Sequence, residues 1–362
     1  MSGALTVLGL ESSCDDTAAG VVRRAADGTV AVLSSLVAGQ DDAHRPFGGV
    51  VPEIAAREHL SAIGGVARRA VEAAGVEWGD LDAVAATAGP GLVGGVITGL
   101  LAGKGLAQSL GVPLLAVNHL EGHALSARLA DDCPFPFLLL LVSGGHTQLL
   151  EVGGVGRYHR LGSTIDDAAG EAFDKTAKVL GLGFPGGPEV ERWAARGDAR
   201  AVSLPRPLGR TDHADFSFAG LKTAVARAWE ASEQTDTDRA DIAASFQAAV
   251  ADVVESRVEN AIRAYGASSD GKRLVVAGGV ARNAALRERL QGIAARHGFR
   301  LLAPPPEFCT DNAAMIALAG LERLARGERD ALDAPARPRW PLDAASARGA
   351  PKSGSGKKGP KS

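Results

Sequence analysis

The chain has 362 residues, more than a single hydrophobic core usually supports, so two lobes or domains are expected. Apolar residues make up 46% and charged residues 22%, as in an ordinary globular protein. The formal charge is −3, so a nucleic-acid partner would have to bind a local basic patch or helper subunits. The three cysteines are widely spaced and odd in number, so they form no disulfide framework, and a reducing compartment is the simplest interpretation. No signal-peptide pattern is evident and the apolar segments are short and interrupted, so we expect a cytoplasmic protein without a transmembrane helix or membrane contact.

The chain begins with the pattern of a buried strand, a tight polar turn and a returning strand. Residues 7–11 and 18–22 are strand-like, and the turn between them reads Ser-Ser-Cys-Asp-Asp-Thr. Further on, a strand at 83–87 leads into the Gly-rich segment 89–95 and a helix through Leu110. A helix that begins behind glycines offers free N–H groups and the positive end of its dipole to an anion.

Residues 118–123, Asn-His-Leu-Glu-Gly-His, form the sharpest local signal. They follow a strand-like run, and Asn118 is a suitable N-cap for a helix. His119 and His123 then lie one turn apart on one face, where two imidazoles can share a metal ion. Glu121 lies about 200° around the helix from His119. This differs from the His-Glu-x-x-His motif of zinc peptidases, and a metallopeptidase is therefore disfavoured.

The second half repeats the organisation of the first. Strand-like residues 137–142 and 148–152 flank the turn Ser-Gly-Gly-His-Thr, and a strand at 273–277 leads into the Gly-rich segment 278–283 and a helix through about Leu290. The duplication predicts an α/β fold of two related actin/hexokinase-like lobes whose turns meet at a central ligand cleft. Two unrelated α/β domains remain the alternative.

Three carboxylates between these units form a further candidate. Asp167, Glu171 and Asp174 are spaced to share one helix face, and a carboxylate at a cleft can accept the hydroxyls of a ribose. Acidic residues on a helix are also commonly solvated, and that reading stays open.

Asp311 is the best candidate for a third metal ligand, because it lies just before an apolar helix expected at about 312–330. Two histidines and one carboxylate leave open positions for water or substrate, as in a catalytic site. A purely structural histidine pair remains the alternative.

The expected organisation is therefore a first lobe of residues 1–130, completed by the helix at about 312–330, and a second lobe of residues 131–311 that contains a helical insertion. Residues 343–362 are rich in Lys, Ser, Gly and Pro and predict a disordered basic tail.

Over almost its whole length the sequence resembles the tRNA N6-adenosine threonylcarbamoyltransferase family, and its details are similar to the bacterial type. The resemblance runs from Gly9–Thr17 to Arg339–Leu342. The matching motifs between these ends are Asn118–His123, Val142–Thr147, Asp166–Lys175, Pro185–Pro188, Gly278–Val280 with Asn283, and Thr310–Asn312. So many separate motifs in one order make the resemblance specific.

The resemblance implies that His119, His123 and Asp311 bind one iron(II) per subunit, with zinc possible. It also implies a set of substrate-binding residues: Leu141, Val142, Ser143, Gly144, Gly145, Asp174, Gly187 and Asn283. Glu191 stands where the family commonly has Asp, and the tail beyond Leu342 departs from the shorter family pattern.

The implied reaction moves a threonylcarbamoyl group from threonylcarbamoyl-AMP to N6 of adenosine 37, in tRNAs that read codons beginning with A, and releases AMP. Because the adenine amine is a poor nucleophile, the donor must be polarised and its phosphate stabilised, which an open-sided metal and Gly-rich N–H groups can do. The general base stays open among Glu11, Asp15 and His146. The implied partners are tRNA, a paralogous subunit of related fold, a small ATPase and a separate synthase that makes the adenylate.

Two other functions compete with this prediction. A small-molecule kinase of the same fold would need an acidic base and magnesium instead of a helical histidine pair. A non-catalytic scaffold would be expected to lack the metal ligands.

Overall fold

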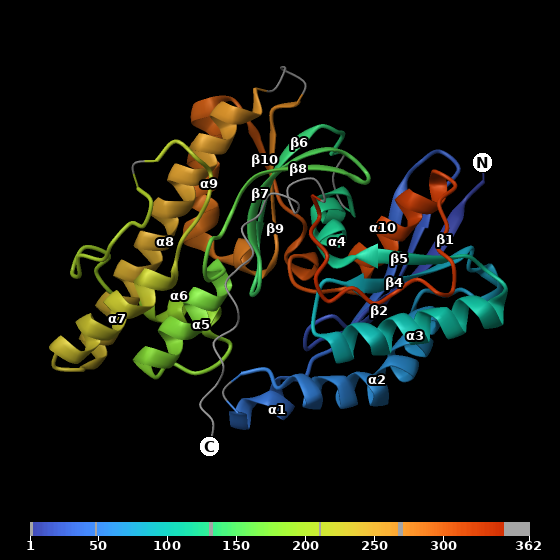
Figure 1. Ribbon diagram of the computed structural model, residues 1–362, viewed down its shortest axis with the longest axis horizontal. Helices are drawn as coiled ribbons and strands as arrows, with labels where there is room; N and C mark the ends of the chain where they lie inside the picture. The colour runs from blue at the N-terminus through green and yellow to red at the C-terminus, as the bar shows by residue number, and fades with distance from the viewer. Residues whose placement is uncertain (1–2, 48, 130–132, 210, 267–270, 344–362) are drawn as a thin grey trace.

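The computed structural model describes residues 3–47, 49–129, 133–209, 211–266 and 271–343. They form two α/β lobes that lie side by side in Figure 1, each built on a mixed five-stranded sheet. The predicted α/β fold of two related lobes is confirmed.

The first sheet has the strand order β3-β2-β1-β4-β5. Its strands are β1 (Leu5–Glu11), β2 (Thr17–Arg24), β3 (Val30–Ala38), β4 (Ala83–Gly89) and β5 (Leu114–Asn118). β1 pairs antiparallel with β2 and parallel with β4, so it lies in the middle of the sheet. Every residue of β1 and β4 is buried, which explains their continuous apolar patterns.

The second sheet has the order β10-β9-β6-β7-β8. Its strands are β6 (Phe137–Val142), β7 (Thr147–Gly154), β8 (Arg157–Ser163), β9 (Arg273–Ala277) and β10 (Arg300–Leu302). β7 pairs antiparallel with both β6 and β8, and the central strand β6 pairs parallel with β9. The first sheet has the same pattern. The two sheets therefore share one topology, and the repeat in the sequence is a repeat in the fold.

Helices cover both faces of the first sheet. The helices between the strands of this sheet are α1 (Asp41–His44), η1 (Arg45–Phe47), α2 (Pro52–Ala73), η2 (Trp78–Asp80) and α3 (Val93–Leu110). α2 and α3 pack on one face, and α10 (Ala313–Ala325), from the end of the chain, packs on the other. α10 lies so close to β1 that a Cβ at Gly9 would be 2.2 Å from the carbonyl oxygen of Ala313. Only glycine fits at that position.

The second sheet is covered in a corresponding way. One face packs against its own helices, which are α5 (Ala169–Leu180), α6 (Gly186–Ala194), α7 (Ala219–Ala231), α8 (Asp236–Tyr265) and α9 (Ala284–His297). Two short helices complete this half, η5 (Gly279–Arg282) and η6 (Pro306–Phe308). The other face receives α4 (His119–Leu125) and η3 (Ser126–Leu129), which come from the first half of the chain. Each sheet is thus covered on one face by a helix from the other half.

Several elements differ from the sequence expectations. α9 continues to His297, seven residues beyond Leu290. After α10 the chain returns to the first sheet, where Asp330 forms an isolated antiparallel bridge with Leu114, the first residue of β5. Asp167 precedes α5, which begins at Ala169, so the three predicted carboxylates do not share one helix face.

The first residue of the expected tail is ordered. Asp343 is buried, and its carboxylate accepts a hydrogen bond from the N–H of Arg160 at 2.9 Å. Residues 344–362 of the tail lie outside the described residues. We propose that residues 1–130 with α10, and residues 131–311, make up the two lobes. Within the described ranges, every helix is too short or too polar to cross a membrane.

Candidate metal and substrate site

The helix α4 carries the histidine pair at the junction of the lobes (Figure 1). The chain leaves β5 at Asn118, whose side-chain oxygen accepts a hydrogen bond from the N–H of Leu120 at 2.9 Å, as predicted for an N-cap. All seven residues of α4 are buried. The rings of His119 and His123 lie on one face, with their centroids 4.7 Å apart.

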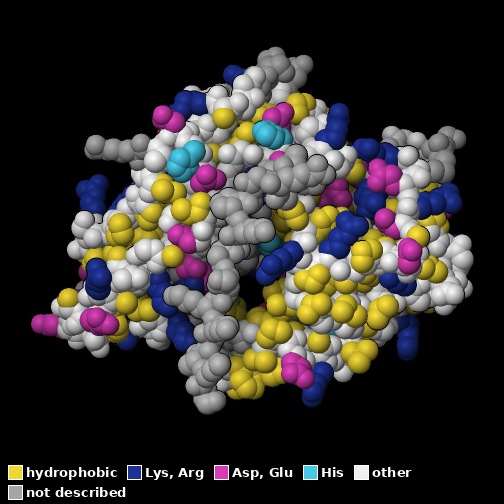
Figure 2. All heavy atoms as spheres, in the orientation of Figure 1, with side chains coloured by type: hydrophobic (Ala, Val, Ile, Leu, Met, Phe, Trp, Pro, Cys, Tyr) yellow, Lys and Arg dark blue, Asp and Glu magenta, His cyan; other side chains and the backbone are white. Residues whose placement is uncertain are grey.

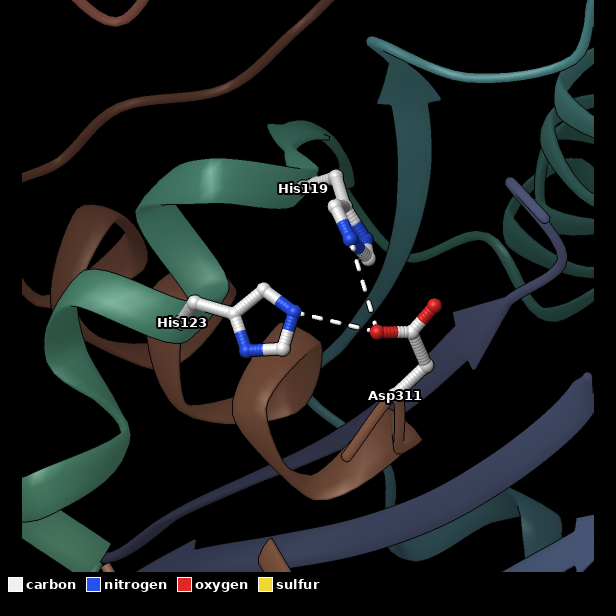
Figure 3. Close-up of side chains that lie close together, drawn as sticks. All are labelled: His119, His123 and Asp311. Atoms are coloured by element: carbon white, nitrogen blue, oxygen red, sulfur yellow. Dashed lines mark hydrogen bonds and ion pairs between the residues drawn. The ribbon is translucent and has the colours of Figure 1, made fainter. Parts of the chain in front are cut away.

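Asp311 meets this pair from a position 188 residues away in the chain. Its Oδ1 lies 3.0 Å from Nε2 of His123 and 3.6 Å from Nε2 of His119, and Figure 3 shows both rings directed at the carboxylate. The next residue, Asn312, caps α10 by accepting a hydrogen bond from the N–H of Met315. The cap fixes the backbone from which Asp311 projects.

A buried network orients His119. Its Nδ1 lies 2.8 Å from Oε2 of Glu11 and 3.1 Å from Oγ of Ser13. Glu11 also accepts hydrogen bonds from the hydroxyl of Thr87 at 2.7 Å and from the N–H of Ser13 at 2.6 Å. A hydrogen bond from Nδ1–H to the carboxylate leaves Nε2 directed at Asp311, which is the arrangement of a metal-binding histidine and its supporting carboxylate.

The charges of this cluster favour a cation. Burial alone would raise the pKa of Asp311, but His119 and His123 outweigh burial and hold that pKa below its usual range. Burial alone would lower the pKa of His119, but Glu11 and Asp311 raise it to about 9. A metal ion would therefore displace a proton held between ligands.

The donor set fits a metal. His119, His123 and Asp311 offer two nitrogens and one oxygen within 4.8 Å of one another, the only such group of three among the described residues. Such a set suits borderline metals such as iron(II) or zinc and leaves positions open. Nδ1 of His123 is buried without a hydrogen-bond partner among the described residues, so Nε2, at 3.0 Å from Asp311, is the nitrogen of this ring that has a polar contact.

The turn between β6 and β7 packs against the start of α5. Its carbonyls accept hydrogen bonds from the first N–H groups of α5, from Gly170 to Ser143 at 3.2 Å and from Glu171 to Gly144 at 3.1 Å. The N-terminus of α5 is therefore occupied by the turn itself. Gly144 and Gly145 are exposed, so their backbone is accessible to a ligand.

A cavity of about 430 Å³ adjoins this turn. Of the substrate-binding residues implied by the resemblance, Gly144, Asp174, Gly187 and Asn283 line it. Leu141 and Val142 are fully buried within β6, so only their backbone can take part in binding. Ser143 and Gly145 flank Gly144 on the same turn.

Eight further residues line the cavity although the sequence did not name them as binding residues: Gly170, Phe173, Pro185, Pro188, Gly279, Val280, Arg282 and Thr310. All but Arg282 lie within motifs that carry the resemblance, and Arg282 lies in the Gly-rich segment 278–283. Thr310 connects the cavity to the metal cluster, because Asp311 follows it directly.

Two carboxylates of the cavity each use one oxygen for a backbone N–H. Oδ1 of Asp174 accepts from Gly186 at 2.8 Å, and Oε1 of Glu191 accepts from Ala284 at 2.7 Å. Glu191 therefore lines the cavity although the family commonly has Asp there. The side chain of Asn283 caps α9 through Leu286 and donates to Gln247.

The three candidate bases differ in their surroundings. Glu11 is 1% exposed and both of its oxygens accept hydrogen bonds, which favours a positioning role. Asp15 is half-buried. Burial of Asp174 raises the pKa of that carboxyl, and the charge of Asp15 raises it further. Burial and the nearby His119 and His123 lower the pKa of His146 to about 4, so its imidazole is neutral at pH 7.

Glu121 points away from the metal cluster. Its Oε1 accepts hydrogen bonds from the hydroxyl of Tyr158 and from the N–H of Gly156. The glutamate of a zinc peptidase acts on a metal-bound water, and Glu121 has no access to one.

Comparisons with known proteins agree with this geometry. A family model described as tRNA N6-adenosine threonylcarbamoyltransferase matches residues 31–318. Relatives with that name from Maricaulis maris and Caulobacter vibrioides are 61% and 62% identical to this chain. Each alignment covers 99% of this chain, and they cover 96% and 98% of the two relatives.

Solved structures of low sequence identity share the fold. Component A of the (R)-2-hydroxyglutaryl-CoA dehydratase of Acidaminococcus fermentans superimposes with a TM-score of 0.51 at 16% identity, covering 88% of this chain and 96% of that one. HypF of T. kodakarensis superimposes with a TM-score of 0.58 at 17% identity, covering 90% of this chain and 48% of that one. The chain thus has the two-lobed fold of the actin/hexokinase-like proteins.

Proposed function

The chain belongs to the tRNA N6-adenosine threonylcarbamoyltransferase family and forms threonylcarbamoyl-adenosine at position 37 of tRNA, and we propose that its donor is threonylcarbamoyl-AMP, bound in the cavity beside His119, His123 and Asp311. AMP is the product that leaves. The proposed substrates are tRNAs that read codons beginning with A, and the proposed location of the reaction is the cytoplasm, where such tRNAs are used. The observation that carries the proposal is the cluster of two imidazoles and one carboxylate next to a cavity of about 430 Å³.

His119, His123 and Asp311 are the proposed ligands of one iron(II) per chain, with zinc as the alternative. The donor set supports this assignment, and the contact from Glu11 prepares Nε2 of His119 for coordination. When bound, the metal would act as a Lewis acid toward an oxygen of the donor.

The cavity supports binding of the adenylate by its two carboxylates. Asp174 and Glu191 each hold one oxygen on a backbone N–H, which leaves the second oxygen of each to accept ribose hydroxyls. The exposed backbone of Gly144 and Gly145 is suited to the phosphate or carbamate oxygens. Gly187 lets the ligand approach the start of α6, and Asn283 contributes the wall of the cavity.

Adenosine 37 must leave its loop to bring N6 into the cleft. A proton then leaves N6 as the new bond to the carbamoyl carbon forms, and the bond to the phosphate oxygen breaks. Asp15 and neutral His146 are the remaining candidates for the group that accepts this proton, because Glu11 is saturated by hydrogen bonds.

The surface supports a partner subunit. Val93, Ile97 and Leu101 recur every fourth residue along α3 and are 56%, 42% and 58% exposed, and Leu60 of α2 is 73% exposed. Figure 2 shows hydrophobic side chains gathered over α2 and α3. Apolar patches of this kind commonly mark interfaces. We propose that this apolar α2–α3 face binds the paralogous subunit, and that a small ATPase completes the assembly.

The test is reconstitution with unmodified tRNA, the partner subunits and chemically supplied threonylcarbamoyl-AMP, followed by mass spectrometry of the nucleosides. We expect the threonylcarbamoyl mass at adenosine 37 with the wild-type chain and its loss with His123→Ala or Asp311→Ala. Modification that occurs when the separate synthase and its substrates are present, but not when threonylcarbamoyl-AMP is supplied directly, would contradict the donor assignment. Magnesium-dependent phosphorylation of a sugar would favour the kinase.

A further inference from the structure

Each face of the short helix α4 contacts another part of the protein. His119 and His123 face Asp311, and Leu120 packs into the apolar cluster of the second sheet. Gly122 faces α10, where an added Cβ would lie 2.8 Å from Cδ1 of Ile316. Glu121 occupies the remaining face, and neither the metal nor the donor cavity explains its burial.

Glu121 contacts the tip of the hairpin formed by β7 and β8. The residue is 6% exposed, and its Oε1 accepts hydrogen bonds from the hydroxyl of Tyr158 at 2.8 Å and from the N–H of Gly156 at 3.2 Å. α4 continues from β5 of the first sheet, whereas the hairpin belongs to the second sheet. These hydrogen bonds therefore join the metal-bearing helix to the opposite lobe.

The helix α10, which begins two residues after Asp311, contacts the same tip. Arg326, just after α10, donates a hydrogen bond from Nη1 to the carbonyl of Val155 at 2.8 Å. The side chain of Val155 is 5% exposed and packs in the apolar cluster that contains α10. Residues 155–158 thus contact both α4, which carries His119 and His123, and the end of α10, the helix that follows Asp311.

The opposite end of β7 reaches the donor cavity. β7 runs from Thr147 to Gly154, and the turn that ends at its first residue carries Gly144 and Gly145. β7 is hydrogen-bonded on both sides, to β6 and β8, with two irregularities in its pairing with β8. The hairpin therefore links the donor-binding turn at one end to α4 and the end of α10 at the other.

We propose that Glu121 and Tyr158 are positioning residues, which form a latch that sets the distance between the metal ligands and the donor. The proposal rests on the proposed function of the cleft. A cavity of about 330 Å³ lies behind the latch and is lined by Glu121, Gly156 and Arg323, among others. This space allows α4 to shift when the hydrogen bond is absent. Reactions between held groups depend steeply on such distances.

Tyr158→Phe is the test, because it removes one hydroxyl and keeps the ring. In the reconstituted reaction we expect kcat to fall about tenfold to a hundredfold, the effect of one hydrogen bond to a carboxylate. The KM values for donor and tRNA, and the metal bound per chain, should stay at wild-type values. Hydrogen exchange of the α4 amides should become faster in the same variant.

Two further variants separate positioning from general destabilisation. Tyr265→Phe makes the same change at the only other tyrosine of the chain, whose hydroxyl contacts the carbonyl of Gly271 far from the cleft. It should leave kcat and α4 exchange unchanged. Glu121→Gln keeps an oxygen acceptor for Tyr158 and should retain most of kcat. Glu121→Leu also removes the acceptor of the Gly156 N–H and should lower kcat at least as much as Tyr158→Phe.

The latch is overturned by unchanged kcat and exchange in Tyr158→Phe, by a kcat loss that follows loss of metal, or by an equal effect of Tyr265→Phe. A wild-type chain that binds metal but does not modify tRNA from the adenylate would instead refute the proposed function. In that case hydrogen exchange of the α4 amides in Tyr158→Phe still decides whether the latch exists.

Discussion

At the scale of single residues, the site depends on which nitrogen of His119 carries a proton. Glu11 accepts from Nδ1 while itself held by Thr87 and the N–H of Ser13, so the carboxylate cannot turn away. Metal-binding histidines are commonly fixed in this way, and loss of the supporting group weakens metal binding. The sequence placed Glu11 at the turn but did not indicate its contact with His119.

Glu11→Gln tests this role. An amide NH₂ directed at Nδ1 of His119 would favour the tautomer that has its hydrogen on Nε2, where the metal must bind. We expect metal affinity to fall about tenfold to a hundredfold, measured by competition with a chelating indicator. Ser13→Ala, which removes only the hydroxyl at 3.1 Å, should have a smaller effect. Equal affinity of wild type and Glu11→Gln would contradict the assignment.

Asp16 gives a second prediction at this scale. Burial, together with the charges of Asp311 and Asp15, raises its pKa from 3.8 to about 7 in the metal-free protein. Between these values the folded state holds a proton that the unfolded state has released, so the free energy of unfolding decreases as pH rises from about 4 to about 7.

Asp16→Asn should therefore stabilise the metal-free protein at pH 8 by about 2 kcal/mol, once the shift is discounted for partial exposure, and have little effect at pH 4.5. Urea unfolding at both pH values measures the difference, with Asp333→Asn, at an exposed position that does not act on Asp16, as the control. Added metal should reduce the gain, because it compensates the charge of Asp311. A gain of the same size at both pH values would show that the charge of Asp16 is not its cause.

At the scale of elements, α3 combines two roles. Its inner face packs on the first sheet, and its outer face carries Val93, Ile97 and Leu101. A helix that is apolar on both faces reads in sequence as fully buried, so periodicity alone does not reveal that one face is exposed. Only the positions of the sheet and of α2 define the free face.

Ile97→Asp should abolish binding of the partner subunit through this face, because it buries an unpaired carboxylate in an apolar interface. Analytical ultracentrifugation of the mixed subunits measures the complex. Metal content and the unfolding transition of the isolated chain should not change. Thr98→Asp on the same helix, whose hydroxyl bonds within the helix to Gly94, is the control that adds the same charge. A complex that persists in Ile97→Asp would exclude this face.

At the scale of the whole molecule, the two lobes exchange helices. α10 covers the first sheet and α4 covers the second, although each comes from the other half of the chain. Unfolding of either lobe would therefore expose an apolar face of the other. Of the three proposed metal ligands, His119 and His123 lie on α4, and Asp311 lies just before α10.

Calorimetry should accordingly give one transition, with calorimetric and van't Hoff enthalpies that agree, despite the two-lobed shape. Gly9→Val, which forces α10 away from β1, should lower the midpoint without splitting the transition. Two resolved transitions, with the second unaffected by Gly9→Val, would show that the lobes unfold independently.

The sequence by itself determined the family, the repeated strand and turn patterns, and the histidine pair on one turn of helix. These features are local, because strand alternation, N-caps and i to i+4 spacing depend on neighbouring residues. The strands β3, β8 and β10 escaped prediction, since edge strands alternate weakly and β10 has only three residues. The tertiary structure alone decided that Asp311 reaches the histidines, that Glu11 supports one of them and that Glu121 turns to Tyr158. Such contacts join segments far apart in the chain, and only the path of the folded backbone brings them within hydrogen-bonding distance.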